Sequence, residues 1–377
     1  MKNLCYNAFI GLDIDIRGRV RPCCKILGNS MPVFAVENGI KEYQESKWLS
    51  NFQKQFLDGE RPAGCIRCWK EEDAGVKSKR QLDYERYKEQ FEKLDLHSKT
   101  DFKNILMSFG NLCNLACRIC SPARSSKWAS EMNNLDGKRY PIYTWHKDKK
   151  VMEDIFQFTK NAIHFDITGG EPLLVESEEH FDFLNRLQEH GNSKKISLHY
   201  VTNGTTYPGE EYLKVWKSFK EVDIQMSIDG TEEKFEFNRW PAKWSQVYSN
   251  IKKYQKLKKE SENIKLSLSH TISAFTIYYV DDFVKWCLRE GLPMPWMGVL
   301  NWPTHYRPSV FKKSVRDKIK EHLLQSKSSQ VRNLTNYLDT DDSDSFGDFE
   351  DWVAKLDKAR TQTFSKTFPE LWKMFTH

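Results

Sequence analysis

The segment NILMSFGNLCNLACRIC, residues 104–120, decides the fold of this 377-residue chain. It opens with the short apolar run NILMSF, which predicts a buried β-strand. Cys113, Cys117 and Cys120 follow within eight residues. Three thiolates so close together can converge on one metal centre, and soft sulfur ligands favour zinc, copper(I) or an iron–sulfur cluster.

The same rhythm continues downstream, where short apolar runs alternate with segments of helical spacing. Five further strands are expected, at residues 162–168, 196–202, 221–228, 264–272 and 296–301. Helical segments between successive strands favour right-handed βα units and a parallel sheet. The sequence therefore predicts an α/β fold, a partial (β/α)6 barrel of the TIM type, with its chemistry at the carboxyl ends of the strands.

Four regions are expected along the chain. Residues 1–80 hold five cysteines and many turn residues but few long apolar runs, which indicates a small cysteine-rich domain organised around a metal. Residues 81–102 are charged, with apolar residues at helical spacing, and predict a connecting helix. The barrel is expected to span residues 103–301, and residues 302–377 to form a helical C-terminal region.

The composition and the N-terminal segment argue against a membrane protein and against a secreted protein. The 58 Lys and Arg against 52 Asp and Glu give a net charge of +6, only a weak hint of an acidic partner. No stretch approaches the roughly 18 consecutive apolar residues of a membrane helix. Asp13 and Asp15 interrupt the N-terminal segment too early for a secretory signal. We therefore expect a cytoplasmic protein without a membrane partner, in which closely spaced cysteines bind metal rather than form disulfides.

Three cysteine ligands at one centre leave one coordination position open. A structural zinc site would need a fourth ligand close by, and the sequence continues with SPARSS, which supplies none. Other glycine-rich or polar segments end the next strands: Gly169-Gly170-Glu171, then Asn203 in VTNGT, then Ser227 in SIDG. Because the strand ends of such a fold share one rim, we expect these segments to form one site with the cysteines.

With these motifs the sequence resembles the radical SAM superfamily. The resemblance rests on C-x3-C-x2-C, GGEP, TNG and SIDG in that order within residues 103–301. It implies that Cys113, Cys117 and Cys120 hold a [4Fe–4S] cluster whose open iron binds S-adenosylmethionine (SAM). One electron then cleaves SAM to methionine and a 5′-deoxyadenosyl radical, which abstracts a hydrogen from the substrate. By resemblance the SAM-binding residues are Gly169, Gly170 and Glu171 at the methionine amine, Ser227 and Asn203 at further polar contacts, and Arg239 at the carboxylate.

The N-terminal cysteines form a second constellation. Cys5, Cys23, Cys65 and Cys68 come from two separate segments and make a plausible closed four-thiolate site, with a zinc ribbon as the alternative. Together with Gly18 they resemble the motif of twitch and SPASM domains, which implies one auxiliary iron–sulfur cluster of the [4Fe–4S] type. Most relatives carry this domain after the barrel, whereas here it precedes the barrel.

Two cysteines, Cys24 and Cys287, lie outside these two sets. Cys24 is the alternative to Cys23 as a ligand, although the glycine spacing favours Cys23. Cys287 lies in an apolar helical pattern and is expected to be a buried structural cysteine.

By resemblance, the expected function is oxidoreductase-type radical SAM catalysis on a peptide or protein side chain. The auxiliary cluster would assist electron transfer, and a ferredoxin or flavodoxin is the expected reductant. Two alternatives stay open. The basic stretches 252–259 and 311–320 could contact the phosphates of an RNA or nucleotide substrate. A zinc-bearing binding protein that keeps the fold without the chemistry is the other alternative.

Overall fold

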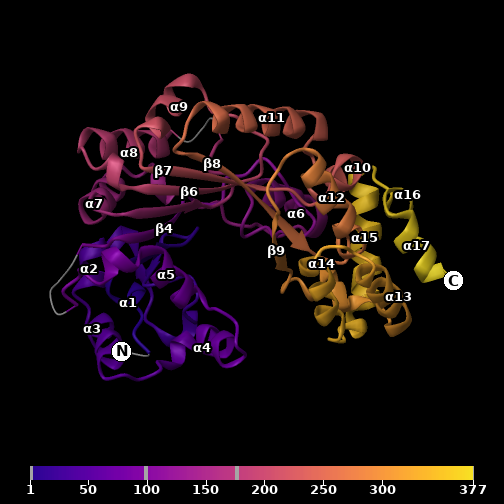
Figure 1. Cartoon of the computed structure of the whole chain (residues 1–377), viewed down its shortest axis with the longest axis horizontal. Coiled ribbons are helices and arrows are strands. Elements are labelled where there is room, and N and C mark those ends of the chain that lie inside the picture. The colour runs from indigo at the N-terminus through magenta and orange to yellow at the C-terminus, as the bar shows by residue number, and fades with distance from the viewer. Residues whose placement is uncertain (1–2, 97–100, 175–177, 377) are drawn as a thin grey trace. The chain divides into compact units, whose positions relative to one another are not determined.

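A computed structural model describes residues 3–96, 101–174 and 178–376 of the chain and divides it into two compact units (Figure 1). The first unit comprises Met1–Cys113, Pro141–Val201 and Pro208–Asp223. The second comprises Asn114–Tyr140, Thr202–Tyr207 and Ile224–His377.

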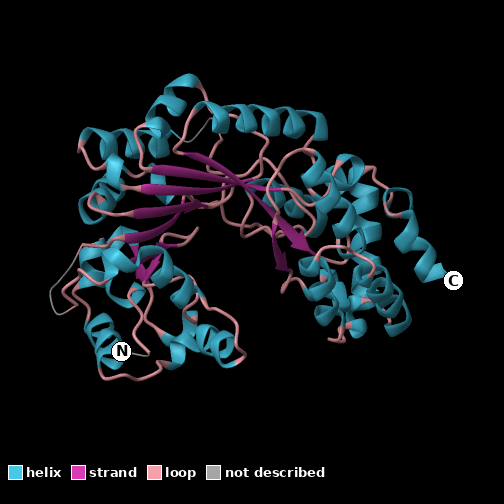
Figure 2. Ribbon diagram, viewed as in Figure 1, coloured by secondary structure: helices cyan, strands magenta, loops and turns pink. Residues whose placement is uncertain are grey.

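The first unit is built on a sheet in which the strands follow the order β3-β2-β1-β4-β5-β6 (Figure 2). The strands are β1 Gly11–Ile14, β2 Arg19–Arg21, β3 Phe34–Ala35, β4 Asn104–Ser108, β5 His164–Thr168 and β6 Ser197–Thr202. β1, β4, β5 and β6 are parallel, and β2 and β3 join antiparallel. β1 to β3 are not among the strands expected from the apolar runs, because runs of four residues or fewer carry little periodicity.

The helices of the first unit are α1 Asn7–Ile10, α2 Ile40–Gln44, α3 Lys47–Leu57, α4 Ile66–Asp73, α5 Lys79–Phe91, α7 Lys149–Thr159, α8 Glu178–Glu189 and α9 Glu210–Lys217. Aromatic residues pack two of them, α8 and α9, against the sheet. Phe183 of α8 packs edge-on against Phe165 of β5, with ring centroids 5.6 Å apart. Trp216 of α9 packs against Tyr200 of β6 at 5.0 Å. These large buried rings hold α8 and α9 on the sheet.

Helix α5 lies where the sequence predicts a connecting helix. It begins at a capping box, in which Ser78 and Gln81 satisfy each other's backbone amides, and it ends at Phe91. The predicted helix runs further, to residue 102, and residues 97–100 of it lie outside the described part of the chain.

The second unit contains the end of β7 Glu221–Ser227 together with β8 Ile264–Ile272 and β9 Trp296–Val299. β8 and β9 are parallel, with Ser269 opposite Trp296. Its helices are α6 Ser126–Asp136, α10 Glu232–Asn238, α11 Trp244–Glu260, α12 Val280–Arg289, α13 Lys313–Leu324, α14 Ser329–Asn333, α15 Phe346–Arg360, α16 Phe364–Thr367 and α17 Pro369–Thr376.

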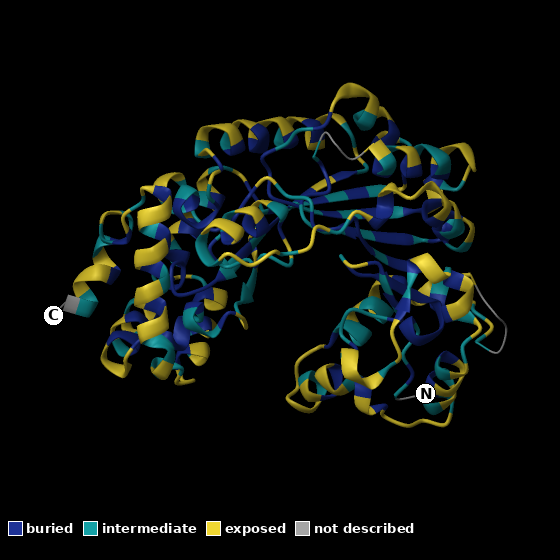
Figure 3. Ribbon diagram, turned by 180° about the vertical axis from the view of Figure 1, so that it is seen from behind, coloured by how far each residue is buried: buried dark blue, intermediate teal, exposed yellow. Residues whose placement is uncertain are grey.

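Phe275, just after β8, lies at the centre of the aromatic core of the second unit. Its ring contacts Phe237 of α10, Tyr306, Phe349 of α15 and Phe368. This cluster joins the end of β8 to the C-terminal helices through apolar burial. Figure 3 shows strands that are largely buried and helices that expose their outer faces.

The six strands expected from the apolar runs are all present, as β4 to β9. The predicted α/β fold with a parallel sheet is confirmed, and its closure into a partial (β/α)6 barrel stays a prediction. Cys287 is fully buried in α12, as expected. Within residues 3–96, 101–174 and 178–376, no helix has the length and apolar character that crossing a membrane requires.

Candidate functional site

In the first unit, the turn after β5 is hydrogen-bonded to the loop that leads to Cys113. The amide of Gly170 donates to the carbonyl of Gly110 at 3.2 Å, and the amide of Glu171 donates to that of Leu112 at 2.8 Å. Only glycine fits at position 170, because a Cβ there would collide with the Leu112 carbonyl. The predicted GGE segment therefore lies against the backbone immediately before the first cysteine of the motif.

The conformation of the turn also depends on its first and last residues. Gly169 has φ of +131°, a value that residues with a Cβ rarely adopt. The buried Glu171 carboxylate accepts a hydrogen bond from the amide of Leu173 at 3.0 Å. Glu171 thus holds the shape of its own turn through its side chain, while its amide ties the turn to the cysteine loop.

His180 of α8 supports the same turn from the helix side. Its Nδ1 lies 3.3 Å from the carbonyl oxygen of Pro172 and 2.7 Å from the hydroxyl of Tyr212, and its Nε2 lies 3.0 Å from that of Tyr200. Burial lowers the pKa of His180 to about 3, so the ring is neutral near pH 7. A carbonyl only accepts, so the contact with Pro172 is a hydrogen bond in the tautomer that has its proton on Nδ1.

In the second unit, the loop with the other two cysteines of the motif lies against the C-terminal end of α10. The amides of Ala116 and Arg118 donate to the carbonyls of Trp240 and Asn238 at 2.7 and 2.8 Å. The carbonyl of Cys117 accepts a hydrogen bond from the indole of a tryptophan in α6 at 2.7 Å. Backbone pairing therefore brings the cysteine loop beside the segment that contains the predicted Arg239.

Arg239 is a buried cation beside these thiols. Its guanidinium forms a 2.7 Å ion pair with Asp229, whose other oxygen accepts a hydrogen bond from the amide of Thr271 at 2.8 Å. Burial raises the pKa of Cys117 to about 12, and the charge of Arg239 acts in the opposite direction on Cys117 and Cys120. Among the described residues, the buried Nε of Arg239 has no hydrogen-bond partner.

Asn203 lies in a closed ring of polar side chains. Its amide donates to Asn114 at 2.9 Å, Asn114 donates to Thr205 at 2.9 Å, and the Thr205 hydroxyl donates back to Asn203 at 2.6 Å. Asn203 therefore helps to position Asn114, which directly follows Cys113. The hydroxyl of Ser227 on β7 lies 3.1 Å from that of Ser269 on β8.

Four cysteines of the first unit line one pocket, and they are the four predicted for the auxiliary cluster: Cys5, Cys23, Cys65 and Cys68. The pocket spans about 430 Å³, which includes space open to solvent, and its remaining wall includes the apolar side chains of Ile26, Phe52, Phe56 and Trp69. Burial raises the pKa of Cys5 to about 12 and raises that of Cys65 as well. Soft sulfur donors around a mostly apolar pocket fit an iron–sulfur cluster or a soft metal ion.

Cys24 does not line this pocket. It lies instead on a neighbouring polar pocket, whose wall it shares with Cys23. Over the described ranges 3–96, 101–174 and 178–376, the structure contains no group of three or more His, Cys, Asp or Glu side chains placed to hold a single metal ion.

Three supporting residues were not assigned from the sequence. Asn114 and Asn203 are 89 residues apart, and His180 meets tyrosines on two other elements, so no local pattern marks them. Asp229 carried a signal, since it lies in the SIDG segment two residues after Ser227. Its pairing with Arg239 depends on the fold of α10.

Comparisons with known proteins show what this chain is similar to. Residues 107–272 match the model of the Radical SAM superfamily. A cysteine-type anaerobic sulfatase-maturating enzyme of Clostridium novyi (strain NT) is 23% identical over 206 residues, which cover 52% of this chain and 51% of the relative. The chain thus matches about half the length of that curated relative.

Two solved structures illustrate the structural likeness. The structure of native anSMEcpe with bound AdoMet is 22% identical, with 58% of each chain covered and a TM-score of 0.43. That of Streptococcus suis SuiB bound to S-adenosylmethionine is 13% identical, with 83% of this chain and 68% of SuiB covered and a TM-score of 0.40. The family model and the curated relative both show similarity to radical SAM proteins.

Proposed function

We propose that this chain is a radical SAM enzyme that acts on a peptide or protein side chain with the help of one auxiliary cluster. The observation that carries the proposal is the hydrogen-bonded pairing of Gly170 and Glu171 with the loop before Cys113. This pairing brings a glycine turn to the first cysteine of the motif. Backbone carbonyls of such a turn are suitable acceptors for the ammonium group of SAM.

The cysteines Cys113, Cys117 and Cys120 would hold the [4Fe–4S] cluster. When bound, the cluster and SAM supply a 5′-deoxyadenosyl radical, which abstracts a hydrogen from the substrate. Arg239 offsets the negative charge of the thiolates, and its buried Nε is suited to an anionic group such as the SAM carboxylate. Ser227 and Asn203 contribute polar groups in the same unit.

The four-cysteine pocket supports the auxiliary cluster. Its apolar wall would keep water away from a cluster held by Cys5, Cys23, Cys65 and Cys68. Four protein thiolates would complete the ligation of the cluster, which favours electron transfer over direct binding of the substrate. Iron analysis separates this proposal from a zinc-bearing binding protein: we expect about eight irons per chain after anaerobic reconstitution, two four-iron clusters.

The proposed substrate class is a protein or peptide. The curated relative is by name a sulfatase-maturating enzyme, and a sulfatase is a protein. The RNA alternative depends on basic stretches in which several lysines already have carboxylate partners. Lys252 pairs with Glu290 at 2.6 Å and Lys313 with Asp317 at 2.6 Å. Such pairing leaves less free positive charge for phosphates.

The test is anaerobic formation of 5′-deoxyadenosine by the iron-reconstituted protein with dithionite and a small-molecule-depleted lysate. The lysate is treated beforehand with protease or with ribonuclease. We expect protease alone to abolish the stimulation by the lysate, and a loss with ribonuclease alone would assign the substrate to RNA. The Cys113→Ala/Cys117→Ala/Cys120→Ala variant is the control, and product formation by it would contradict the assignment of the cluster ligands.

A further inference from the structure

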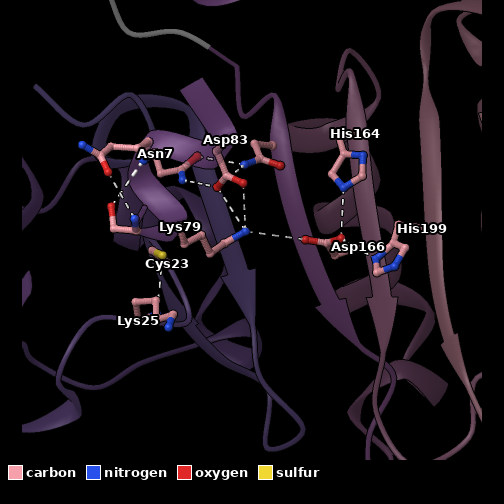
Figure 4. A network of polar contacts seen from close by, with 11 residues as sticks. Asn7, Cys23, Lys25, Lys79, Asp83, His164, Asp166 and His199 are labelled. Carbon is pink, nitrogen blue, oxygen red and sulfur yellow. Dashed lines mark hydrogen bonds and ion pairs between the residues drawn. The ribbon is translucent and has the colours of Figure 1, made fainter. Parts of the chain in front are cut away.

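A partly buried cation lies on the polar side of the auxiliary-cluster cysteines. Lys79 begins α5, and its ammonium lies 3.0 Å from a carboxylate oxygen of Asp83 and 3.9 Å from one of Asp166 (Figure 4). A quarter of the Lys79 side chain is exposed. Two carboxylates on different elements therefore hold the ammonium in one place.

Both carboxylates are fixed by further hydrogen bonds. Asp166 accepts from His164 at 3.0 Å and from His199 at 2.9 Å, and Asp83 accepts from Asn7 at 2.7 Å. Burial acts to raise the pKa of Asp166, but His164, His199 and the Lys79 ammonium hold that pKa well below its usual range. Asp166 is thus charged near neutral pH, and the Lys79 ammonium faces two carboxylates that are themselves held in place.

Lys79 and the cysteines share a pocket. Lys79, Cys23, Cys24 and Asp166 line a polar pocket of about 240 Å³ in the first unit. Cys23 also lines the neighbouring four-cysteine pocket. Cys23 is therefore shared by the pocket of the proposed cluster and the pocket of Lys79, and the charges of Cys23 and Lys79 act on each other.

Two other cations, Lys25 and Arg80, line the four-cysteine pocket itself, and each is paired with a carboxylate. Lys25 pairs with Glu71 at 2.8 Å and Arg80 with Glu72 at 2.5 Å, both within the first unit. The backbone amide of Lys25 also donates to the Cys23 sulfur at 3.4 Å. Lys79 differs from these cations because it lies on the Cys24 side of Cys23, in the polar pocket.

We propose that Lys79 is a positioning residue for electron transfer, whose fixed charge stabilises the reduced state of a cluster held by Cys23 and its three partners. The inference rests on the proposed auxiliary cluster. One electron arrives from an external one-electron donor, no bond forms or breaks, and Lys79 keeps its proton in both states. An added negative charge beside an ammonium is favoured by Coulomb attraction, so Lys79 raises the reduction potential.

The test is a potentiometric titration followed by electron paramagnetic resonance, on the full chain carrying Cys113→Ala, Cys117→Ala and Cys120→Ala. This background leaves only the auxiliary cluster, and we expect about four irons per chain. Lys79→Met should make the midpoint more negative. We expect about a tenfold drop in the ratio of reduced to oxidised cluster at a fixed potential, or about 59 mV for one electron.

Three further variants sharpen the result. Lys79→Arg keeps the charge and should stay close to the background chain. Lys77→Met removes an exposed lysine that pairs with Glu85 and should leave the midpoint unchanged. Asp166→Asn removes a negative charge from the same pocket, so the midpoint should become more positive, opposite to Lys79→Met.

The outcomes separate the two proposals. A background chain without cluster iron would overturn the auxiliary cluster, and the role of Lys79 with it. A loaded cluster whose midpoint is the same in Lys79→Met and Lys77→Met would overturn the role of Lys79 alone. If Lys79→Met does not retain iron, Asp166→Asn decides: a positive shift supports the inference, and an unchanged midpoint contradicts it.

Discussion

Arg118, between the second and third cysteines of the motif, forms an ion pair with Asp357 of α15, with 2.5 Å between Nη2 and Oδ1. The two residues are 239 positions apart in the chain. The Arg118 guanidinium also lies 3.7 Å from the centre of the Phe237 ring and is completely buried. Burial lowers its pKa to about 10, which leaves it protonated near pH 7. The C-terminal region thus helps to hold the cysteine loop.

Removal of the carboxylate at position 357 should loosen that loop. Asp357→Ala leaves Arg118 as a buried charge without its ionic partner, so we expect the free energy of unfolding to fall by about 3 kcal/mol. Lys358→Ala changes an exposed residue of the same helix and should stay within about 0.5 kcal/mol of the wild type. Chemical denaturation of the two variants measures the difference, and equal stabilities would show that the ion pair contributes little.

A methyl group at position 170 should disrupt the turn that we propose binds SAM. Gly170→Ala places a Cβ on the carbonyl of Leu112, so the turn must move away from the loop before Cys113. A displacement of about 1 Å at a reacting centre can cost about a hundredfold in rate. We expect a loss of this order in 5′-deoxyadenosine formation, while Gly209→Ala, with open space around its Cβ, should retain wild-type activity. Wild-type rates for Gly170→Ala would contradict the role of the turn.

Cys23 and Cys24 should differ in iron binding. Cys23 lines the four-cysteine pocket and Cys24 does not, so Cys23→Ala should lower the iron content by about four per chain. Cys24→Ala should keep the full content, as should Cys287→Ala, which changes a cysteine buried in α12. Iron analysis after anaerobic reconstitution measures this. Loss of iron in Cys24→Ala with retention in Cys23→Ala would reverse the assignment.

Arg239 offers a test of SAM recognition. Hydrogen bonds to charged groups contribute about 1.5–3 kcal/mol, so Arg239→Met should raise the dissociation constant of SAM by about tenfold to a hundredfold. Arg289→Met, which changes an exposed residue of α12, is the matched control. Calorimetry on reconstituted protein gives both constants. Unchanged affinity in Arg239→Met would limit Arg239 to its ion pair with Asp229.

His180 should make stability depend on pH. Its pKa is about 3 in the folded chain and near 6.5 when exposed, so the unfolded chain binds the extra proton first as the pH falls. The contribution to stability is complete above pH 6.5 and is lost between pH 6.5 and 3, by about 1.4 kcal/mol per pH unit.

The measurement is the free energy of unfolding from pH 7 to pH 4.5. His180→Gln should show a shallower slope than the wild type, whereas His190→Gln, an exposed histidine just after α8, should keep the wild-type slope. Parallel curves for all three proteins would mean that His180 is not buried in its neutral form.

The sequence by itself determined the strands β4 to β9 and marked the segments that we propose carry the chemistry. Those strands contain apolar runs with clear boundaries, and the cysteine and glycine motifs are local, so neighbouring residues are enough to reveal them. It also grouped Cys5, Cys23, Cys65 and Cys68, which the structure places around one pocket. The SAM-contact roles of Asn203, Ser227 and Arg239 stay predictions.

The tertiary structure alone decided which residues support those segments. β1 is too short to show a pattern, and it joins the sheet because β4 offers a parallel edge to it. Asn203, Lys79 and Arg118 find their partners on elements distant in sequence. A buried polar or charged side chain needs a partner, because leaving it unpaired away from water costs free energy. Which residue becomes that partner depends on how the chain folds, so the local sequence does not reveal it.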